Sequence, residues 1–232
     1  MTLNSQFDLL LAGAGHAHLG VLRLWRDGRR PPGRIGLLSE GPYAWYSGML
    51  PGLLAGRYRQ EQCRIALAAL CASAGVEFLE GRLVGLYPAS NTLELESGKR
   101  LSASWLSLNV GSQPLAPGSS EPSIELLPVK PFAAFVQRWS EWQKTPQSLA
   151  VLGGGAAGVE LALALARQVP QLTLLSNDKL LSGQPAALRS RALRHLATAG
   201  VQVVEGVAVD AIRDDCLLAD GQVAWRGGRV IL

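Results

Sequence analysis

Two glycine-rich turns contain the residue types and spacing that are best suited to chemistry in this chain. Their sequences are Gly13-Ala14-Gly15-His16-Ala17-His18 and, about half a chain later, Gly153-Gly154-Gly155-Ala156-Ala157-Gly158. Glycine tolerates positive φ and lets the backbone approach a pyrophosphate, and the N-terminus of a following helix supplies N–H groups and partial positive charge to that anion. One such turn is weak evidence, but two in matching contexts predict that the chain binds two nucleotides.

The elements that must position these turns are a strand before each turn and a helix after it. Residues 7–12 form an apolar run typical of a buried parallel strand, and residues 17–25 have the apolar spacing of a helix that packs on a sheet. Residues 148–152 and 159–166 repeat this order around the second turn. Each turn is therefore predicted to join a strand to a helix.

The remaining segments of the two halves follow a shared plan. In the first half we expect strands at 34–40 and 76–79, a helix at 60–74, a meander of short strands at 83–101 and a strand at 105–110. In the second half we expect helices at 132–144 and 185–199, strands at 172–176 and 201–205, and a meander at 207–232. This duplicated order predicts an α/β fold of two Rossmann-like domains, with parallel sheets and antiparallel β-meanders in three layers (β/β/α).

Two further features of the first half could contact a nucleotide. Glu40 follows the second predicted strand, where a carboxylate can accept hydrogen bonds from an adenosine ribose. It could equally be a surface acid, because its interval from the glycines exceeds the usual spacing of roughly 20 residues. Residues 41–52 combine three aromatic side chains with glycine and proline. They could form the wall of a site for a flat ring system, or pack a long loop on its own domain.

Length, composition and charge agree with a soluble, enzyme-like chain of two modest domains. The chain has 232 residues, 48% of them hydrophobic, which is enough for a sizeable core. The formal net charge is +4, and the only basic cluster surrounds the end of the first predicted helix, at Arg23, Arg26, Arg29, Arg30 and Arg34. This cluster is a solvated helix end or an electropositive patch for an anionic partner or membrane surface. No nucleic-acid motif accompanies it, so we expect no nucleic-acid partner.

Several other kinds of site and segment are not indicated. The sequence has no targeting segment, and no apolar run approaches the roughly 18 residues that span a bilayer, so we expect a cytoplasmic protein without a transmembrane segment. Cys63, Cys71 and Cys216 form no CxxC pair and no zinc-ligand spacing, and we interpret them as buried structural thiols. The three histidines form no ligand constellation either, so no metal site is expected.

Four segments together resemble the two-dinucleotide-binding flavoproteins, the pyridine nucleotide-disulfide oxidoreductase-like superfamily that includes type II NADH dehydrogenases and sulfide:quinone oxidoreductases. These segments are the first glycine turn, residues 46–52, Val129-Lys130-Pro131 and residues 153–160. In particular, they look like the flavoprotein module that is fused to selenophosphate synthetase in some organisms. The resemblance spans nearly the whole chain. It implies an FAD-binding domain at 1–128 and an NAD(P)-binding domain at 129–232 that is inserted in the first and is incomplete at its C-terminus.

The resemblance implies an FAD site in the first domain. The first glycine turn would hold the FAD pyrophosphate, Glu40 the ribose, and the segment after the aromatic residues would lie near the isoalloxazine ring. Leu83 would face the adenine through its backbone. Gly111 would pass close to FAD, in a turn whose Asn109 and Val110 replace the usual small pair. The residues implied in the turn and near the ring are Gly13, Gly15, His16, Ala17, His18, Ser47, Gly48, Met49, Leu50 and Pro51.

The resemblance also implies a site for NADH or NADPH in the second domain, with Glu160 near the nicotinamide. Ser176 stands where many relatives carry an acid for the NADH ribose, which leaves the choice between the two cofactors open. Lys130 is a candidate for approaching the flavin, where a cation would favour the reduced ring. A surface lysine is the alternative. The turn residues implied at this site are Gly153, Gly155, Ala156, Ala157 and Gly158.

Two departures from the superfamily bear on the mechanism. Residues 17–51 contain no cysteine, which excludes the dithiol relay of the disulfide reductases. In relatives, the strand at residues 229–232 continues into a segment that returns to the FAD domain. We therefore expect this chain to be a truncated form. In the quinone reducers that segment carries an amphipathic anchor, and association with a membrane surface would depend on it.

The function that the resemblance implies is FAD-dependent NAD(P)H oxidoreductase activity. A hydride would pass from the nicotinamide to the flavin, and electrons would continue to an unidentified small-molecule acceptor, with quinones among the candidates. The alternative is a nucleotide-binding accessory module without turnover, linked to selenium metabolism. The sequence predicts neither the acceptor nor the oligomeric state.

Overall fold

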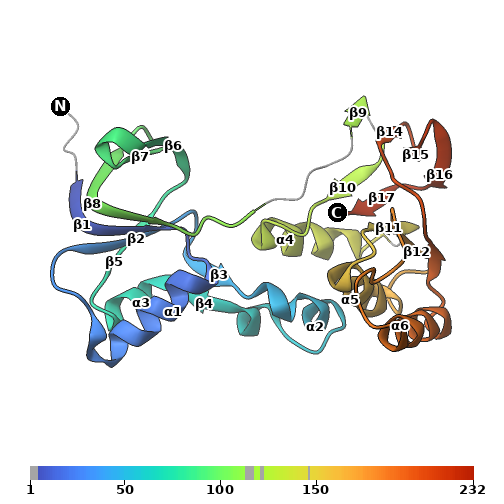
Figure 1. The fold of residues 1–232 in the computed structure, drawn as a ribbon, viewed down its shortest axis with the longest axis horizontal. Helices are drawn as coiled ribbons and strands as arrows, with labels where there is room; N and C mark the ends of the chain where they lie inside the picture. Colours follow the sequence, from blue (N-terminus) through green and yellow to red (C-terminus); the bar gives the residue numbers. More distant parts are fainter. Residues whose placement is uncertain (1–4, 113–117, 121–122, 146) are drawn as a thin grey trace. The chain divides into compact units, whose positions relative to one another are not determined.

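The computed structural model describes residues 5–112, 118–120, 123–145 and 147–232. They form two compact units (Figure 1). Unit 1 consists of Met1–Tyr46 and Arg64–Ser112, and unit 2 consists of Ser47–Cys63 and Gln113–Leu232. The domain ranges 1–128 and 129–232 stay a prediction.

Unit 1 is built on a six-stranded sheet with the order β5-β2-β1-β8-β7-β6. Strands β5, β2, β1 and β8 are parallel, whereas β7 and β6 continue the sheet in antiparallel fashion. A separate hairpin pairs β3 with β4. The elements are β1 (Ser5–Ala12), α1 (His16–Leu24), β2 (Ile35–Ser39), β3 (Tyr43–Trp45), β4 (Arg64–Ala66), α3 (Leu67–Ser73), β5 (Glu77–Glu80), β6 (Leu83–Tyr87), β7 (Thr92–Leu95) and β8 (Arg100–Leu108).

Two apolar clusters hold the layers of unit 1 together. On one face of the sheet, Leu22 of α1 and Leu67 of α3 pack with Leu37 of β2, and all three are fully buried. On the other face, Phe7 and Leu10 belong to a second cluster with side chains of the β6–β8 meander. Because β1 is covered on both faces, its run is apolar rather than alternating. Helices, sheet and meander form the three predicted layers (Figure 1).

Two predicted elements of the first half need correction. The segment at residues 60–74 is a helix only in its second half, because residues 60–63 form a 3₁₀ turn and Arg64–Ala66 pairs with β3. The Arg64 guanidinium lies 4.1 Å from the ring centroid of Tyr43, which favours the hairpin over a longer helix. The predicted strand at 105–110 is the second half of β8, which pairs with β7 at its start and with β1 along its length.

Unit 2 has a five-stranded parallel sheet with the order β10-β17-β11-β12-β13 and a four-stranded sheet with the order β16-β15-β14-β9. Its helices are α2 (Leu50–Leu54), α4 (Phe132–Trp142), α5 (Ala156–Leu165) and α6 (Ala186–Thr198). Its strands are β9 (Gly118–Ser120), β10 (Glu125–Leu127), β11 (Leu149–Leu152), β12 (Leu172–Leu175), β13 (Gln202–Val204), β14 (Ala211–Arg213), β15 (Cys216–Ala219), β16 (Gln222–Arg226) and β17 (Arg229–Ile231).

The core of unit 2 lies on both faces of its parallel sheet. Ile212 and Leu217 of the β14–β16 meander pack against Ala150 and Val230 on one face, and α4, α5 and α6 lie on the other (Figure 1). The prediction of a meander over 207–232 is wrong at its end. Residues 229–231 form β17, which joins the parallel sheet between β10 and β11 and has all three side chains buried.

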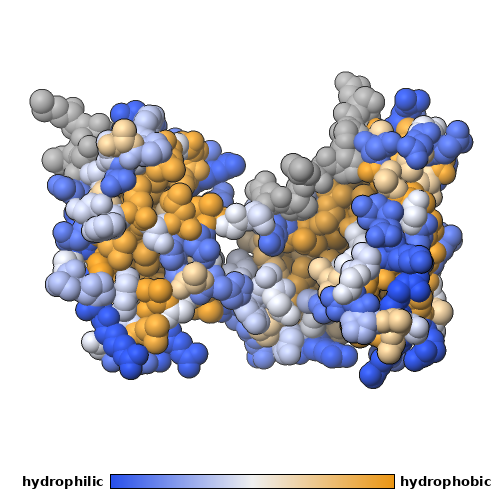
Figure 2. Space-filling model, viewed as in Figure 1, coloured by the Kyte–Doolittle hydropathy of each residue, from blue (hydrophilic) through white to orange (hydrophobic). Residues whose placement is uncertain are grey.

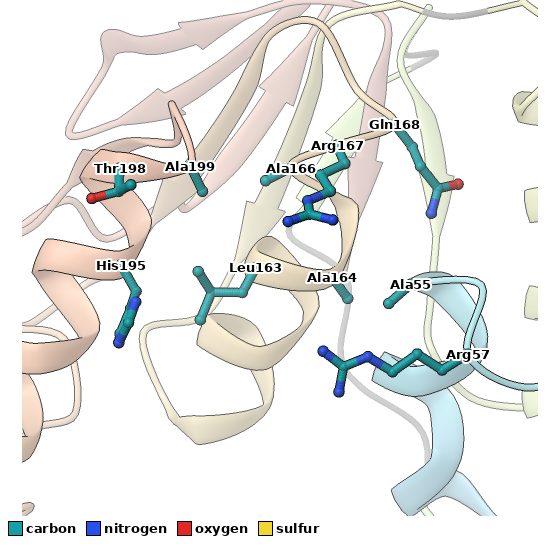
Figure 3. Close-up of a pocket in the computed structure, with 10 residues that line it drawn as sticks. All are labelled: Ala55, Arg57, Leu163, Ala164, Ala166, Arg167, Gln168, His195, Thr198 and Ala199. Carbon is teal, nitrogen blue, oxygen red and sulfur yellow. The ribbon is translucent and has the colours of Figure 1, made fainter.

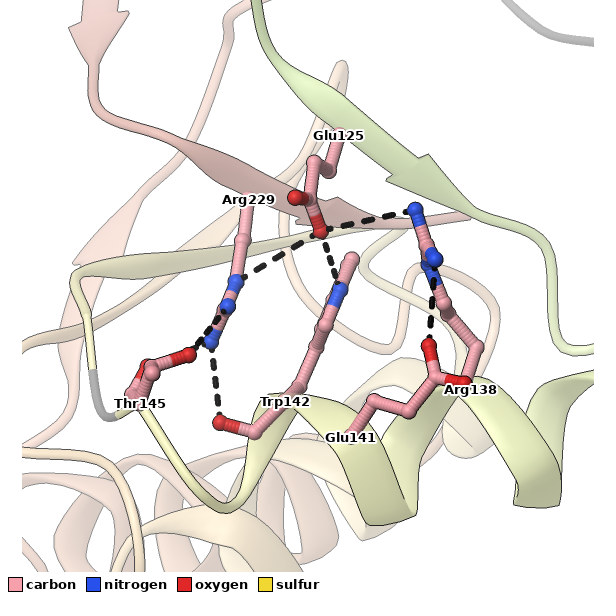
Figure 4. A network of polar contacts seen from close by, with 6 residues as sticks. All are labelled: Glu125, Arg138, Glu141, Trp142, Thr145 and Arg229. Atoms are coloured by element: carbon pink, nitrogen blue, oxygen red, sulfur yellow. Dashed lines mark hydrogen bonds and ion pairs between the residues drawn. The ribbon is translucent and has the colours of Figure 1, made fainter.

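A network of polar side chains fastens α4 to the parallel sheet (Figure 4). Arg229 of β17 is 7% exposed and donates hydrogen bonds to the carbonyl oxygens of Trp142, at 2.9 Å, and Thr145, at 2.6 Å. The Trp142 indole N–H donates to the carboxylate of Glu125, which lies 3.7 Å from the Arg229 Nε. A cation at the end of a helix also complements the helix dipole. The strand that closes the sheet thus fixes the end of α4.

Several apolar side chains of unit 1 lie on its surface. Trp105 and Leu108 of β8 are 75% and 50% exposed, and Val110, just after the strand, is 62% exposed. Figure 2 shows apolar surface among hydrophilic side chains on the face drawn.

None of the helices in the described part of the chain is long and apolar enough to cross a membrane.

Two candidate nucleotide sites

The first glycine turn follows β1 and is shaped by close contact with β8. Gly13 has φ +91° and donates its N–H to the Leu38 carbonyl oxygen at 2.8 Å. A Cβ atom on Gly13 would lie 2.3 Å from the backbone oxygen of Asn109, and one on Gly15 would lie 1.7 Å from Asn109 Oδ1. These positions therefore accept only glycine, and the backbone stays open to a ligand.

Both turns present the start of a helix that no side chain caps. Gly15 and Gly155 are the N-cap residues of α1 and α5, and neither helix has a capping side-chain hydrogen bond or an acid in its first turn. The first four N–H groups of a helix have no acceptor within the helix. A dinucleotide pyrophosphate would satisfy them and meet the positive end of the dipole. In shape and charge, both turns fit this group.

His18 and His16 occupy different environments in the first turn of α1. His18 is 3% exposed, its Nδ1 lies 2.6 Å from the Gly13 carbonyl oxygen, and its Nε2 lies 2.8 Å from Ser107 Oγ. His16 is exposed, and its ring faces the ring of Tyr46 with the centroids 5.2 Å apart. Ala17 lies between them on the helix. His18 thus lies beneath the turn, whereas His16 lies at its open side.

The other unit 1 residues of the predicted FAD site lie at the ends of strands. Glu40 follows β2, is exposed, and has its carboxylate 3.5 Å from the Arg82 Nε. Leu83 is the half-buried first residue of β6. Gly111 is exposed in the turn after β8, with φ +82°. Sequence reasoning noted Asn109 only as a departure from the family pattern, yet its buried Oδ1 has no hydrogen-bond partner in the described residues.

The residues predicted near the flavin ring belong to unit 2. Ser47, Gly48 and Met49 form a short 3₁₀ turn, and Leu50 and Pro51 begin α2. Their position beside the first glycine turn stays a prediction.

The second glycine turn follows β11, and its close contacts lie at Gly154 and Gly158. Gly153 has φ +123° and donates its N–H to the Leu175 carbonyl oxygen at 2.9 Å. A Cβ on Gly158 would lie 1.8 Å from the Gly153 carbonyl oxygen, and one on Gly154 would lie 2.0 Å from Ser176 Oγ. Ser176 comes directly after β12 and is 3% exposed. The predicted ribose residue is thus packed under the turn.

The loop after β12 is held in place by the second turn and by a carboxylate. Leu181, with φ +54°, donates its N–H to the Gly154 carbonyl oxygen at 2.7 Å. The carboxylate of Glu205 accepts from the Leu180 N–H at 2.5 Å and from Arg189 of α6 at 2.6 Å and 2.8 Å. These hydrogen bonds lower the pKa of Glu205, with the Leu180 N–H as the largest cause. Sequence reasoning missed this residue, because its partners Leu180 and Arg189 are 25 and 16 residues away in the sequence.

The two predicted catalytic residues are exposed side chains of unit 2. Glu160 lies on α5, four residues after its first residue, Ala156, which Ala157 follows. Lys130 lies between β10 and α4, before a cis peptide bond to Pro131. Both side chains are thus at the surface, and the roles near nicotinamide and flavin stay predictions.

The cysteines offer no redox pair. Cys63, Cys71 and Cys216 are all free and buried. Burial raises the pKa of the Cys71 thiol to about 11, so that this thiol stays protonated at neutral pH. In the described residues no three potential ligands among His, Cys, Asp and Glu gather as they would around a metal ion.

A cavity of about 670 Å³ lies elsewhere in unit 2 (Figure 3). Its lining includes Arg57, Arg167 and His195, which lie near the C-terminal ends of α2, α5 and α6. Gln168, which also lines it, donates to the Leu54 carbonyl oxygen. The glycine turn lies at the opposite end of α5, so this cavity is separate from the candidate nucleotide site.

The sequence and the fold were compared with known protein families, curated proteins and solved structures. The sequence profile of a family described as pyridine nucleotide-disulphide oxidoreductase matches residues 7–229. No curated protein matches the sequence.

Solved structures with the same fold are numerous. The water-forming NADH oxidase from Lactobacillus brevis, bound to NADH, is 19% identical, with a TM-score of 0.79 over 99% of this chain and 53% of that one. The sulfide:quinone oxidoreductase from Aquifex aeolicus is 19% identical, with a TM-score of 0.71 over 98% and 58%. A ferredoxin reductase from Rhodopseudomonas palustris is 21% identical, with a TM-score of 0.77 over 99% and 58%. The predicted fold class is confirmed, and the chain spans a little over half the length of these proteins.

Proposed function

Because the chain belongs to the pyridine nucleotide-disulphide oxidoreductase family, we propose that it is the dinucleotide-binding part of an FAD-dependent NAD(P)H oxidoreductase. FAD would bind at the first glycine turn and NADH or NADPH at the second. The acceptor of the electrons would be a small molecule. The proposal includes the resemblance to the flavoprotein module that is fused to selenophosphate synthetase, which would link the activity to selenium metabolism.

The observation that carries the proposal is the pair of glycine turns, each of which joins a parallel strand to the start of a helix. In each unit, steric contacts exclude a side chain from the turn, as at Gly13 and Gly158. The helix that follows has neither a side-chain cap nor an acid in its first turn, a property that the other described α-helices share. The order of strand, glycine turn and helix, found twice in one chain, favours two dinucleotide pyrophosphates.

The chain itself would supply binding, orientation and charge. The N–H groups at the start of α1 and α5 would hold the two pyrophosphates. FAD, when bound, would supply the site that accepts a hydride from the nicotinamide. Glu160 would lie beside the nicotinamide, and the ammonium of Lys130 would place positive charge beside the flavin ring. The buried thiols take no part.

The test is reduction of the FAD-loaded chain by NADH or NADPH under anaerobic conditions, followed at the visible absorption band of the flavin. We expect the band to bleach with one or both nucleotides. A chain that binds FAD and NAD(P)H tightly without bleaching would be an accessory module without turnover. A chain that binds neither would overturn the proposal.

A further inference from the structure

The structure assigns to His18 the role of a positioning residue that locks the Gly13–Ala14 peptide of the FAD turn through a hydrogen bond, with Ser107 holding its ring. This inference rests on the proposed function only in naming FAD as the ligand. His18 would not touch the cofactor itself. It would act through the backbone that does.

The hydrogen bonds of His18 define which ring nitrogen carries the proton. The Gly13 carbonyl oxygen, 2.6 Å from Nδ1, can only accept, so Nδ1 must donate to it. In the neutral imidazole Nε2 is then the acceptor, and the Ser107 hydroxyl, 2.8 Å away, can donate to it. Since His18 is 3% exposed, water cannot readily replace either partner. The ring is thus held at both nitrogens.

The direction of the Gly13 carbonyl matters because of peptide planarity. In a trans peptide, the C=O of Gly13 and the N–H of Ala14 point in opposite directions. When His18 holds the carbonyl oxygen on the helix side, the Ala14 N–H must point away from His18. A rotated peptide would instead turn a partially negative oxygen toward the anion. The imidazole therefore keeps the turn in the orientation that an anionic ligand requires.

The second turn shows how the same carbonyl is held without a histidine. Gly158 occupies the position equivalent to His18, and a Cβ there would lie 1.8 Å from the Gly153 carbonyl oxygen. That oxygen therefore packs directly on the Gly158 backbone, where weak Cα–H···O contact and steric fit restrain it. At the first turn, a side chain with a Cβ and a full imidazole ring is accommodated between the Gly13 oxygen and β8. A hydrogen bond replaces the close backbone approach.

The partner of the ring comes from a distant part of unit 1. Ser107 lies on β8, 89 residues from His18 in the sequence. In the parallel pairing of β1 with β8, Ser107 is the partner of Leu11, so strand pairing fixes where the hydroxyl lies. The hydroxyl can then set the rotation of the ring. His18 and Ser107 together tie the glycine turn to β8.

The test compares FAD affinity, measured by titration of flavin fluorescence, among variants of the chain. His18→Leu should weaken FAD binding about tenfold or more, because the Gly13 carbonyl loses its donor. His18→Asn should stay within about threefold of the wild type, since its Nδ2 can donate to the same oxygen. Ser107→Ala should give an intermediate loss. His195→Leu, which removes an exposed imidazole from α6, is the matched control and should bind FAD normally.

Two further readouts separate this role from general support of the fold. NAD(P)H binding at the second turn should be unchanged in His18→Leu, which shows that unit 2 remains folded, and amide hydrogen exchange of β1 and β8 should match the wild type, which shows the same for unit 1. In the chain without FAD, the ring ¹⁵N resonances of His18 should report the Nδ1-protonated tautomer. Equal FAD affinity of the Leu and wild-type chains would overturn the inference while leaving the proposed function intact. If the wild type binds no FAD, the proposed function fails. A ring that carries its proton on Nε2 and none on Nδ1 would overturn the inference independently.

Discussion

At the scale of single residues, the two sites depend on positions where no other side chain fits. The contacts of Gly15 with the Asn109 amide and of Gly158 with the Gly153 carbonyl are shorter than any real Cβ could tolerate. Each involves a different unit, so the two positions allow each site to be disabled separately. By contrast, Glu40 is an exposed acid whose ion pair with Arg82 is of the kind that contributes little to stability.

Gly158→Ala is expected to abolish NAD(P)H binding and to leave FAD binding unchanged. The added methyl group would lie 1.8 Å from the Gly153 oxygen, so either the turn or α5 must shift. Overpacking of this kind typically costs about 1–3 kcal/mol of the free energy of unfolding. Separate titrations with FAD and with NADPH measure the effect.

Gly15→Ala is the reciprocal variant, and it should lose FAD binding while NADPH binding persists. Gly20→Ala is the control, because a Cβ at Gly20 meets nothing within 4 Å. Loss of both ligands in either single-turn variant would contradict the assignment of one nucleotide to each turn.

At the scale of elements, hydrogen bonds between neighbouring strands and helices hold the candidate sites in shape. Glu205, at the end of β13, connects the loop after β12 to α6 through Leu180 and Arg189. Arg229 of β17 fixes the end of α4. Both are charged side chains with well-defined partners, and each connects elements that are distant in the sequence. Their loss is therefore expected to act on whole elements.

Glu205→Gln should destabilise the chain at neutral pH, and the difference from wild type should shrink in acid. The hydrogen bonds of Glu205 lower its pKa in the folded state. Its contribution is thus present above the unfolded pKa of about 4.3 and is lost as pH falls through the folded pKa. We expect about 1 kcal/mol at pH 7, since the carboxylate is partly exposed. Urea unfolding at pH 7 and about pH 3 measures both values, and an equal difference at the two pH values would contradict this role.

Arg229→Met should cost about 3 kcal/mol of the free energy of unfolding. The substitution leaves the carbonyl oxygens of Trp142 and Thr145 without their buried donor and removes one of the two cations beside Glu125. Arg138→Ala is the matched control, because its ion pairs with Glu125 and Glu141 are about half exposed and should contribute less than about 1 kcal/mol. Denaturant unfolding of the two variants makes the comparison. Equal losses would show that Arg229 is not an anchor of α4.

At the scale of the whole molecule, the strand, glycine turn and helix at each site were predictable from the sequence. Glycines, apolar runs and helix-forming residues determine the conformation of the segments in which they stand. What escaped prediction depends on long-range pairing. The second half of β8 continues the strand that begins in the meander, and β17 leaves the second meander for the parallel sheet. The Ser107 hydroxyl beside His18 and the Leu180 N–H beside Glu205 are equally invisible from sequence neighbours.

The two units should respond to different ligands in hydrogen exchange. FAD at 100 times its dissociation constant should stabilise the unit that binds it by about 2.7 kcal/mol, which slows exchange through opening of that unit about 100-fold. We expect this protection in unit 1, around β1, α1 and β8, whereas NADPH should protect β11 and α5 in unit 2. Of unit 2, only residues 47–51 and the segment around Lys130 should respond to FAD, because they are proposed to lie near its ring. In Gly15→Ala the FAD response should vanish while the NADPH response remains. Equal protection of both units by FAD alone would mean that the glycine turns are not separate sites. Unchanged hydrogen exchange at residues 47–51 on addition of FAD would show that this segment does not belong to the flavin site.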